Sequence, residues 1–363
     1  MQLVAYGAQD IYLTGNPQIT FFKVVYRRHT NFAVESIEQT FNGSAELGKK
    51  FSCTISRNGD LLHRVYLEVE LLATTGSVDN LYGFDLIDYV ELEIGGQCID
   101  KHYGQWMALW TNLTHNVDSY TMLENMMGTN TADVKNYIPL QFWFCRNPGL
   151  ALPLIALQYH EVKINVQFVS ATNGNNISNC CVFCDYIFLD TDERRRFAQV
   201  SHEYLIEQVQ TSNAKTVALS ATNSSELRFN HPVKELVWVM VKSDGTAVLP
   251  TATNLLQLNG HDRFKVRSGS YFTDVQRYQH HTGSSSPSTA ITALGDIANY
   301  THVYSFALKP EEHQPSGTCN FSRIDNAVLV TVNGATAGTL TVYAVNYNVL
   351  RIMSGMGGLA YSN

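Results

Sequence analysis

Hydrophobic and polar residues alternate along most of the chain, in short runs that end at Gly, Asn, Asp or Pro. The clearest run, LLHRVYLEVELL at 61–72, places Val65 and Leu67 on one face of an extended segment and Tyr66 and Glu68 on the other. A period of two is the pattern of a half-buried β-strand. The same pattern predicts further strands at 33–41, 49–55, 138–145, 160–169 and 180–190.

One hairpin and only two helices stand out from this pattern. The run DYVELEIGGQCID at 88–100 predicts a hairpin with Gly95 and Gly96 at its turn, because tight hairpin turns require positive φ. The segment GQWMALWTNLTH at 104–115 has apolar residues at helical spacing, and we interpret this stripe as core packing. A second, short helix is predicted at 274–281.

The second half of the chain repeats this order of elements. The run HPVKELVWVMVKSDG at 231–245 resembles the strand at 61–72, and LLQLNGHDRF at 255–264 resembles ELEIGGQCID at 91–100. A predicted helix follows the hairpin each time, and each half ends in a pair of strong strands, at 160–169 with 180–190 and at 325–333 with 339–350. An internal repeat of this kind indicates two copies of one β-domain.

We therefore predict an all-β fold of two consecutive eight-stranded jelly-roll β-sandwiches, a double jelly roll with few short helices. Long excursions at 116–137 and 265–300 fit a jelly roll better than a closed meander barrel. The segment 189–216 is charged and contains neither Gly nor Pro, so we place the domain boundary there. The predicted organisation is an N-terminal arm at 1–30, a first jelly roll at 31–195, a linker at 196–215 and a second jelly roll at 216–363.

The boundary segment carries three consecutive arginines beside three acidic residues. Three arginines among three acids are a poor nucleic-acid site. We interpret them as a salt-bridged linker that fixes one jelly roll against the other. The residues are Arg194, Arg195 and Arg196, beside Asp190, Asp192 and Glu193.

Composition narrows the function. Charged residues make up 16% of the chain, below the roughly 25% of a typical soluble domain, while it contains 19 Tyr and 17 Phe. Such a composition suits β-rich architecture and large subunit interfaces. The net charge of −7 argues against a protein that coats nucleic acid, which needs a basic surface to displace counterions. We predict no direct contact with nucleic acid.

Seven cysteines without regular spacing are a poor disulfide framework and indicate folding in a reducing compartment. The N-terminus lacks the basic and apolar regions of a signal peptide, and no uncharged run approaches the roughly 20 residues that span a bilayer. We therefore expect folding and assembly in the cytosol.

The candidate sites have simple structural interpretations. Cys180, Cys181 and Cys184 have no second ligand pair of the kind that zinc sites use, so we interpret them as small buried residues. His280 and His281 are adjacent in a polar segment and are predicted to lie in a surface loop. The chain has no GxSxG, HExxH, P-loop or GxGxxG motif. We predict no catalytic, cofactor-binding or metal-binding residues.

Two asparagines are candidates for glycosylation. Asn176 and Asn223 each begin an Asn-X-Ser/Thr sequence and are expected on exposed loops. A β-sandwich fold is also compatible with a carbohydrate-binding or carbohydrate-cleaving protein, which we keep as the alternative function. That alternative requires a cleft with convergent aromatic and carboxylate side chains.

Several long blocks resemble one protein family. They include GAQDIYLTGNPQITFFKVVYRRHTNFA at 7–33, LDTDERRRFAQVSHEYLIEQVQ at 189–210 and YAVNYNVLRIMSGMGGLAYS at 343–362. These blocks resemble major capsid proteins of nucleocytoplasmic large DNA viruses, and the resemblance covers the whole chain. It implies a structural protein of the virion, not an enzyme. It also implies a homotrimer of pseudo-hexagonal outline, made in the host cytoplasm and tiled into an icosahedral shell with neighbouring capsomers, minor capsid proteins and penton proteins.

The N-terminal block combines apolar and basic residues, with Phe21, Phe22 and Tyr26 beside Lys23, Arg27 and Arg28. One interpretation is an ordinary edge strand or a buried arm. The other is an assembly arm beneath the shell, which contacts neighbouring trimers, minor capsid proteins or the anionic headgroups of an internal viral membrane.

Overall fold

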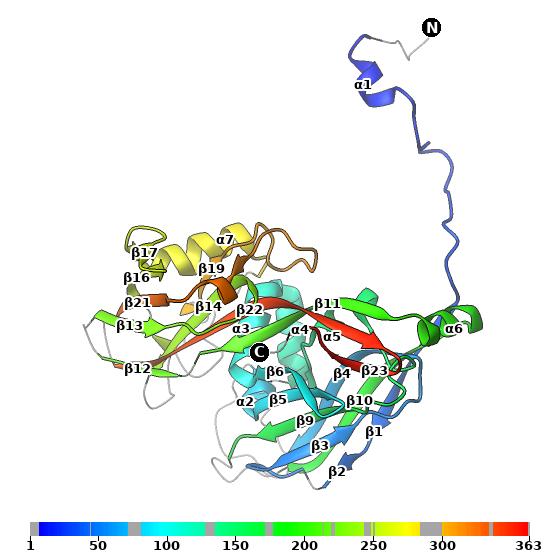
Figure 1. The fold of residues 1–363 in the computed structure, drawn as a ribbon, viewed down its shortest axis with the longest axis horizontal. Coiled ribbons are helices and arrows are strands. Elements are labelled where there is room, and N and C mark those ends of the chain that lie inside the picture. The colour runs from blue at the N-terminus through cyan, green and yellow to red at the C-terminus, as the bar shows by residue number, and fades with distance from the viewer. Residues whose placement is uncertain are drawn as a thin grey trace.

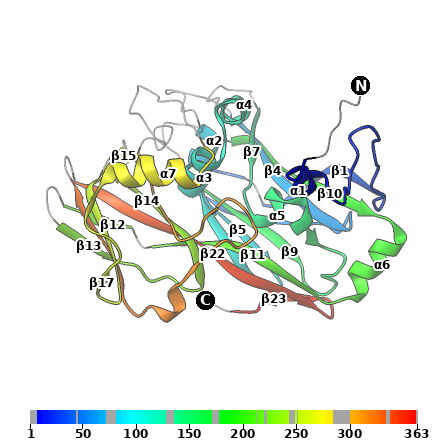
Figure 2. The same cartoon turned by 90° about the horizontal axis from the view of Figure 1, so that it is seen from above.

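The computed structural model describes residues 7–361 except 44, 72–80, 128–134, 171–176, 213, 219–221, 243–247, 250, 284–299 and 334–336. In this part of the chain two β-sandwiches lie side by side (Figures 1 and 2). The segment at 7–31 extends away from both of them and contains one short helix, α1 (Asp10–Thr14).

The first half contains two antiparallel sheets. Sheet A has the strand order β1-β10-β4-β7, with β8 beside β4, and sheet B has the order β2-β3-β9-β5-β6. The strands of sheet A are β1 (Phe32–Gln39), β10 (Ile177–Leu189), β4 (Leu61–Leu71), β7 (Lys135–Pro139) and β8 (Leu152–Pro153). Those of sheet B are β2 (Phe41–Asn42), β3 (Lys50–Thr54), β9 (Val162–Phe168), β5 (Ile87–Ile94) and β6 (Gln97–Tyr103).

The second half also contains two sheets. Sheet C has the order β11-β22-β14-β15, and sheet D has the order β13-β21-β16-β17 with β18 beside β16. Sheet C consists of β11 (His202–Thr211), β22 (Gly338–Met353), β14 (Pro232–Lys242), β15 (Val248–Leu249), β12 (Lys215–Val217), β23 (Met356–Leu359), β19 (His302–Ser305) and β20 (Cys319–Asn320). Sheet D consists of β13 (Thr222–Glu226), β21 (Ala327–Asn333), β16 (Thr251–Leu258), β17 (His261–Asp262) and β18 (Arg267–Ser268).

The two halves share one connectivity. In sheet A the late strand β10 lies between β1 and β4, and in sheet C the late strand β22 lies between β11 and β14. The hairpins match as well, because Gly95 and Gly96 have φ of 57° and 85°, while Asn259 and Gly260 have φ of 52° and 76°. Both pairs have the positive φ that tight hairpin turns require. The predicted double jelly roll is confirmed.

Both predicted helices are present. The first is α3 (Gly104–Thr114), and the second is a π-helical turn, η2 (Tyr271–Val275), that continues into α7 (Gln276–His280). Further short helical segments are α2 (Tyr82–Asp85), α4 (Val117–Met127), α5 (Trp143–Arg146), α6 (Thr191–Gln199), η1 (Pro148–Leu150) and η4 (Phe321–Arg323). No helix in the described part of the chain is both long and apolar enough to cross a membrane.

The strand predicted at 138–145 is wrong beyond Pro139. Strand β7 ends there, and the chain enters α5 at Trp143. The apolar residues Phe142, Trp143 and Phe144 are all buried, so they do not alternate between two faces. Proline has no N–H to donate to the next ladder bond, which is consistent with the strand ending at this point.

Most of the segment predicted as a linker is regular structure. Helix α6 occupies its start, and residues 202–211 form β11, which pairs with β22 along its whole length. The alternation pattern did not predict this strand, because charged residues such as Glu203 and Glu207 interrupt its apolar positions. Its buried stretch, Ile206–Val209, is covered on both faces.

Two apolar clusters account for most of the core. The smaller one lies between sheets C and D and includes Leu236, Trp238 and Met240. The larger one fills the first sandwich and also contains Val237 and Val239 from the second half. The two halves are therefore joined by a shared apolar interface.

Candidate functional site: the joint between the halves and the N-terminal arm

The outer face of sheet C is covered by the first half of the chain; we call this contact the joint. Its apolar centre brings α3 against β22, where the rings of Trp106 and Tyr343 lie 5.2 Å apart between centroids. The Tyr343 hydroxyl donates a hydrogen bond of 2.8 Å to Gln105 Oε1. Val237 and Val239 of β14 are fully buried in the same cluster.

A buried carboxylate, Glu207 of β11, lies at one side of the joint. Its Oε1 accepts a 2.7 Å bond from Lys234 Nζ and lies 3.4 Å from His313 Nδ1, and its Oε2 accepts a 3.1 Å bond from Arg146 of the first half. Burial alone would raise the pKa of Glu207, but the contacts with His313, Arg146 and Lys234 outweigh it and lower the pKa to about 2. Glu207 is therefore an ionised carboxylate that links the halves.

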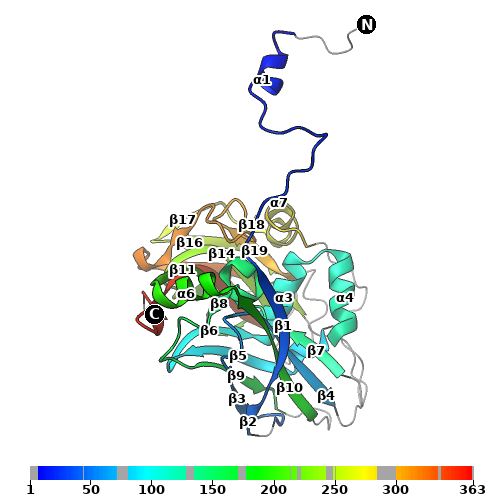
Figure 3. The same cartoon turned by 90° about the vertical axis from the view of Figure 1, so that its right-hand side faces the viewer.

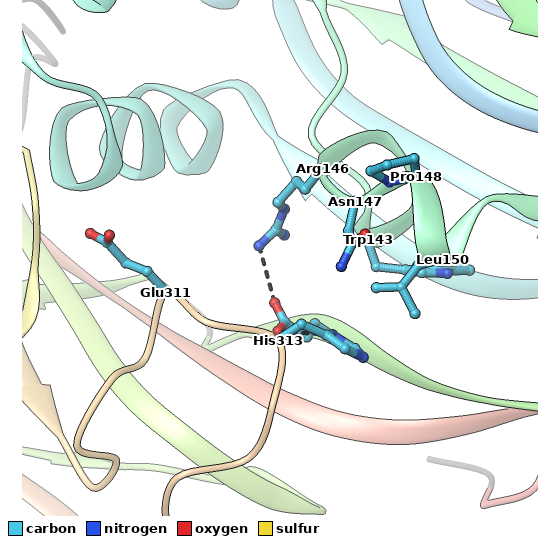
Figure 4. A pocket seen from close by; sticks show the side chains of 8 residues that line it. Trp143, Arg146, Asn147, Pro148, Leu150, Glu311 and His313 are labelled. Atoms are coloured by element: carbon cyan, nitrogen blue, oxygen red, sulfur yellow. Dashed lines mark hydrogen bonds and ion pairs between the residues drawn. The ribbon is translucent and has the colours of Figure 1, made fainter. Parts of the chain in front are cut away.

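The pocket beside Glu207 lies between α5 and the loop that carries Glu311 and His313 (Figure 4). Arg146 reaches into it from α5, and its guanidinium lies 4.6 Å from the Trp110 ring centroid. Arg146 also donates a 3.0 Å hydrogen bond from Nε to the carbonyl of Gln141. Arg146 of the first half and Glu207 of the second half bind each other in this pocket, so their role is to hold the two halves together.

A second buried ion cluster centres on His281. Its Nε2 lies 2.9 Å from Glu235 Oε2, and its Nδ1 lies 3.0 Å from Glu311 Oε1. Burial opposes protonation of His281, but Glu235 and Glu311 outweigh it and raise the pKa to about 9. The prediction that His281 lies in a surface loop is wrong, because two carboxylates hold the charged ring inside the protein. Its neighbour His280 is half-buried.

Backbone groups tie the halves together on both sides of the apolar centre. Asp100 Oδ1 of β6 accepts a 3.1 Å hydrogen bond from the Val209 N–H of β11. Near α3, Arg277 donates a 2.8 Å bond to the Asn112 carbonyl, and the Gly283 N–H donates a 2.8 Å bond to the Leu113 carbonyl. The joint thus combines an apolar centre with hydrogen bonds at its edges.

The cysteine cluster follows the period of strand β10. Cys180 and Cys184 share one face with buried Val182, whereas Cys181 faces outward beside Glu68. Burial raises the pKa of the Cys184 thiol and raises that of Cys181 to about 11. Among the residues that the structure describes, no three His, Cys, Asp or Glu side chains are arranged to hold a metal ion.

The N-terminal arm is exposed in the single chain. Phe21 is 90% exposed, Phe22 is 98% exposed and Tyr26 is 86% exposed. Lys23, Arg27 and Arg28 make no ion pair with any part of the chain that the structure describes. The segment at 19–31 is not a strand and is not buried, so the edge-strand or buried-arm interpretation does not hold for the isolated chain.

The arginine cluster has one strong contact. Arg194 binds both carboxylate oxygens of Asp60, at 2.9 Å from Nε and 3.0 Å from a terminal nitrogen. Asp60 also accepts a 2.8 Å bond from the Leu189 N–H, so α6 is held against the first half. Arg195 and Arg196 make no ion pair with the described residues, and no ion pair there links α6 to the second half.

The two glycosylation candidates fall in different places. Asn176 lies outside the described residues. Asn223 is half-buried on β13, and its amide exchanges hydrogen bonds of 3.3 Å with the backbone N–H and carbonyl of Ala218. The expectation that Asn223 lies on an exposed loop is wrong, because this residue pairs with Thr331 in sheet D.

Sequence reasoning missed the ion clusters of the joint. Their signal was the pair Lys234-Glu235 within the apolar run PVKELVWVMV, where a charged residue falls on each face of a strand. Buried charges must be paired, so a charged pair in such a run predicts partners elsewhere in the fold. Those partners, Glu207 and His281, are distant in sequence and could not be identified from it.

Comparisons with known proteins match this chain to one protein family along nearly its whole length. The family model for the major capsid protein N-terminus matches residues 20–190, and the model for the large eukaryotic DNA virus major capsid protein matches 193–248 and 240–358. A major capsid protein of Pyramimonas orientalis virus is 55% identical, and one of Paramecium bursaria Chlorella virus 1 is 45% identical. Each comparison covers 100% of this chain and 99% of the relative.

Solved structures agree with the fold. A chain of the PBCV-1 virus capsid superposes with a TM-score of 0.82 at 40% identity, covering 95% of this chain and 100% of the other. The Faustovirus major capsid protein superposes with a TM-score of 0.77 at 11% identity, covering 96% and 94% of the two chains. The second similarity supports the double jelly-roll architecture alone.

Proposed function

Since the chain belongs to the family of large eukaryotic DNA virus major capsid proteins, we propose that it assembles as a homotrimeric, pseudo-hexagonal capsomer. Its role is structural rather than enzymatic, and its place is the capsid shell of the virion. The comparisons support this role over the alternative of a carbohydrate-binding or carbohydrate-cleaving β-sandwich.

The trimer proposal rests on a difference between two equivalent sheets: the outer face of one is covered by the rest of the chain, and that of the other is not. The outer face of sheet C is buried under the first half, as the strand β14 shows by its burial on both faces. The equivalent face of sheet A is open, with β1, β10, β4 and β7 at the surface (Figure 3). A molecule with one covered and one open copy of the same face is suited to head-to-tail contact with further copies.

Closing that head-to-tail contact after three chains produces a ring of six sandwiches, with contacts alternately within and between chains. Native mass spectrometry of the purified protein tests this proposal. We expect an assembly of three times 40.6 kDa that persists on dilution. A monomer at micromolar concentration would overturn the proposed capsomer.

We further propose that the arm binds a partner beneath the shell. The partners that fit its exposed aromatic and basic residues are neighbouring capsomers, minor capsid or penton proteins with acidic surfaces, and the internal viral membrane. Deletion of residues 1–30 should leave the trimer intact and prevent its assembly into a shell. Flotation with anionic and with neutral vesicles separates a lipid partner from a protein partner, because only the anionic headgroups attract Lys23, Arg27 and Arg28.

We propose that the protein is assembled in the host cytoplasm and makes no direct contact with the genome. All seven cysteines are free thiols, which suits a reducing compartment, and the net charge is −7. A mobility-shift assay with duplex DNA at low salt should detect no complex with the trimer, whereas a salt-sensitive complex would contradict the second proposal.

A further inference from the structure

We propose that Tyr271 of one copy packs against Phe183 of the next copy, and so repeats between chains the contact that Trp106 makes with Tyr343 within the chain. This inference rests on the proposed trimer and specifies its interface. It identifies the contact surfaces as the outer face of sheet A and the region where β18 leads into η2.

The first step is the equivalence of Phe183 and Tyr343. Strands β4 and β14 each have 11 residues, and aligning them end to end places Tyr66 at the position of Val237. Tyr66 pairs with Phe183 of β10, and Val237 pairs with Tyr343 of β22. Phe183 therefore occupies in sheet A the position that Tyr343 occupies in sheet C.

The burial of the two strands supports this alignment. Val65, Leu67 and Val69 of β4 face the core of the first sandwich. Their counterparts in β14 are Leu236, Trp238 and Met240, which face the core of the second sandwich. Tyr66 and Val237 then both face outward, and only the second of these faces is covered within the chain.

The second step is the equivalence of Tyr271 and Trp106. Helix α3 begins at Gly104, and helical backbone begins at Gly269, two residues before η2. Each glycine lies against the start of a strand, because a β-carbon at Gly104 would collide with the carbonyl oxygen of Ile87 and one at Gly269 with that of Thr251. Ile87 begins β5 and Thr251 begins β16, which are equivalent strands. Two residues after each glycine stands an aromatic residue, Trp106 or Tyr271.

The surroundings of the two aromatic groups differ as the proposal requires. Trp106 is fully buried by the joint, whereas Tyr271 is half-buried and its ring lies 4.0 Å from the Arg267 guanidinium. On the other surface, Phe183 stacks on Tyr66 with 5.3 Å between ring centroids, and both are half-buried.

The charges around the two surfaces are complementary. Exposed Arg263, Lys265 and Arg267 precede Tyr271, whereas Glu38 lies directly opposite Phe183 in the pairing of β1 with β10. Asp185 follows on the same outward face of β10, and with Glu68 and Glu70 of β4 the carboxylates outnumber the basic Arg64 and Lys135 of this face. A basic surface meeting an acidic one favours a second copy of this chain as the occupant and fixes its orientation.

The test uses two variants, Phe183→Asp and Tyr271→Asp, with Tyr159→Asp as the control. Tyr159 is 75% exposed and lies beside the β22–β23 turn, away from both surfaces. Each test variant alone should lose the trimer, and the control should retain it. The two test variants mixed together should form a heterodimer, because one intact contact remains between them, and a ring of three cannot close.

Native mass spectrometry reads these outcomes directly, and the heterodimer shows that both variants are folded. If the wild-type protein and both single variants are trimers, the Tyr271–Phe183 contact is wrong while the capsomer proposal stands. If the wild-type protein is a monomer, the capsomer proposal itself fails. Variants that are monomeric but form no heterodimer when mixed would also overturn the contact.

Discussion

Strands β4 and β14 hold equivalent places in the two halves, yet β4 is buried on one face and β14 on both. The outward positions of β4 are Arg64, Tyr66, Glu68 and Glu70, and those of β14 are Glu235, Val237, Val239 and Val241. The two sandwiches thus have the same strand connectivity but different outer faces. The apolar face is covered within the chain, and the polar and aromatic face remains available for contact between chains.

The largest expected difference between the two strands is at the position of Arg64 and Glu235. Replacement of Glu235 by Ala leaves the charged, buried His281 without one of its carboxylates, so the free energy of unfolding should fall by about 3–5 kcal/mol. The equivalent change Arg64→Ala removes an exposed side chain and should alter it by less than about 0.5 kcal/mol. Urea unfolding of both variants as single chains measures the contrast, and equal losses would contradict the difference in burial between the two outer faces.

A smaller difference is expected at the position of Glu68 and Val239. Val239→Ala opens a cavity in the joint and should lower the free energy of unfolding by about 2 kcal/mol. Glu68→Ala removes an ion pair with Lys135, whose side chain is half-exposed, so the loss of stability should be smaller than for Val239→Ala. A Val239→Ala protein as stable as the wild type would mean that the joint is loosely packed.

The pH dependence of stability should separate the joint from the rest of the molecule. The pKa of Glu207 is lowered to about 2, so its stabilising effect is complete above the ordinary carboxylate pKa and is lost as pH falls from about 4.5 toward 2. The pKa of His281 is raised to about 9, so its effect is complete below the ordinary histidine pKa and is lost as pH rises from about 6.5 through 9.

Replacement of single residues identifies the source of each loss. The variant Glu207→Gln should show a smaller acid loss than the wild type, and His281→Gln a smaller alkaline loss, in thermal unfolding measured from pH 3 to pH 10. A variant with the full loss of the wild type would place the titrating group elsewhere.

The smallest expected effect concerns α6. Arg194→Ala removes the two-point contact with Asp60 and should lower the free energy of unfolding by at most about 1 kcal/mol, because Arg194 is half-exposed. The neighbouring change Arg195→Ala is the matched control and should have no measurable effect. Equal effects of the two replacements would show that the contact between Arg194 and Asp60 contributes no stability.

The sequence was most informative where local pattern and tertiary environment agree. Alternation in 61–72, the paired turn residues at 95–96 and the apolar stripe of 104–115 each require only neighbours along the chain to be interpreted, and the structure confirms them. The consecutive apolar residues of LVWVMV at 236–241 also indicate a strand covered on both faces, which the alternating pattern alone does not predict.

The positions of most strands along the chain, the hairpin turns and the core-facing side of those strands follow from periodicity and turn chemistry, because those properties are local; the sequence alone determined them. Which face of which sheet is covered, and which charges meet inside, was decided only by the tertiary structure. Glu207 meets Lys234 and Arg146, and His281 meets Glu235, because the fold brings distant strands and loops together. A buried charge can be recognised from its neighbours along the chain, whereas its partner is selected by the packing of the two halves against each other.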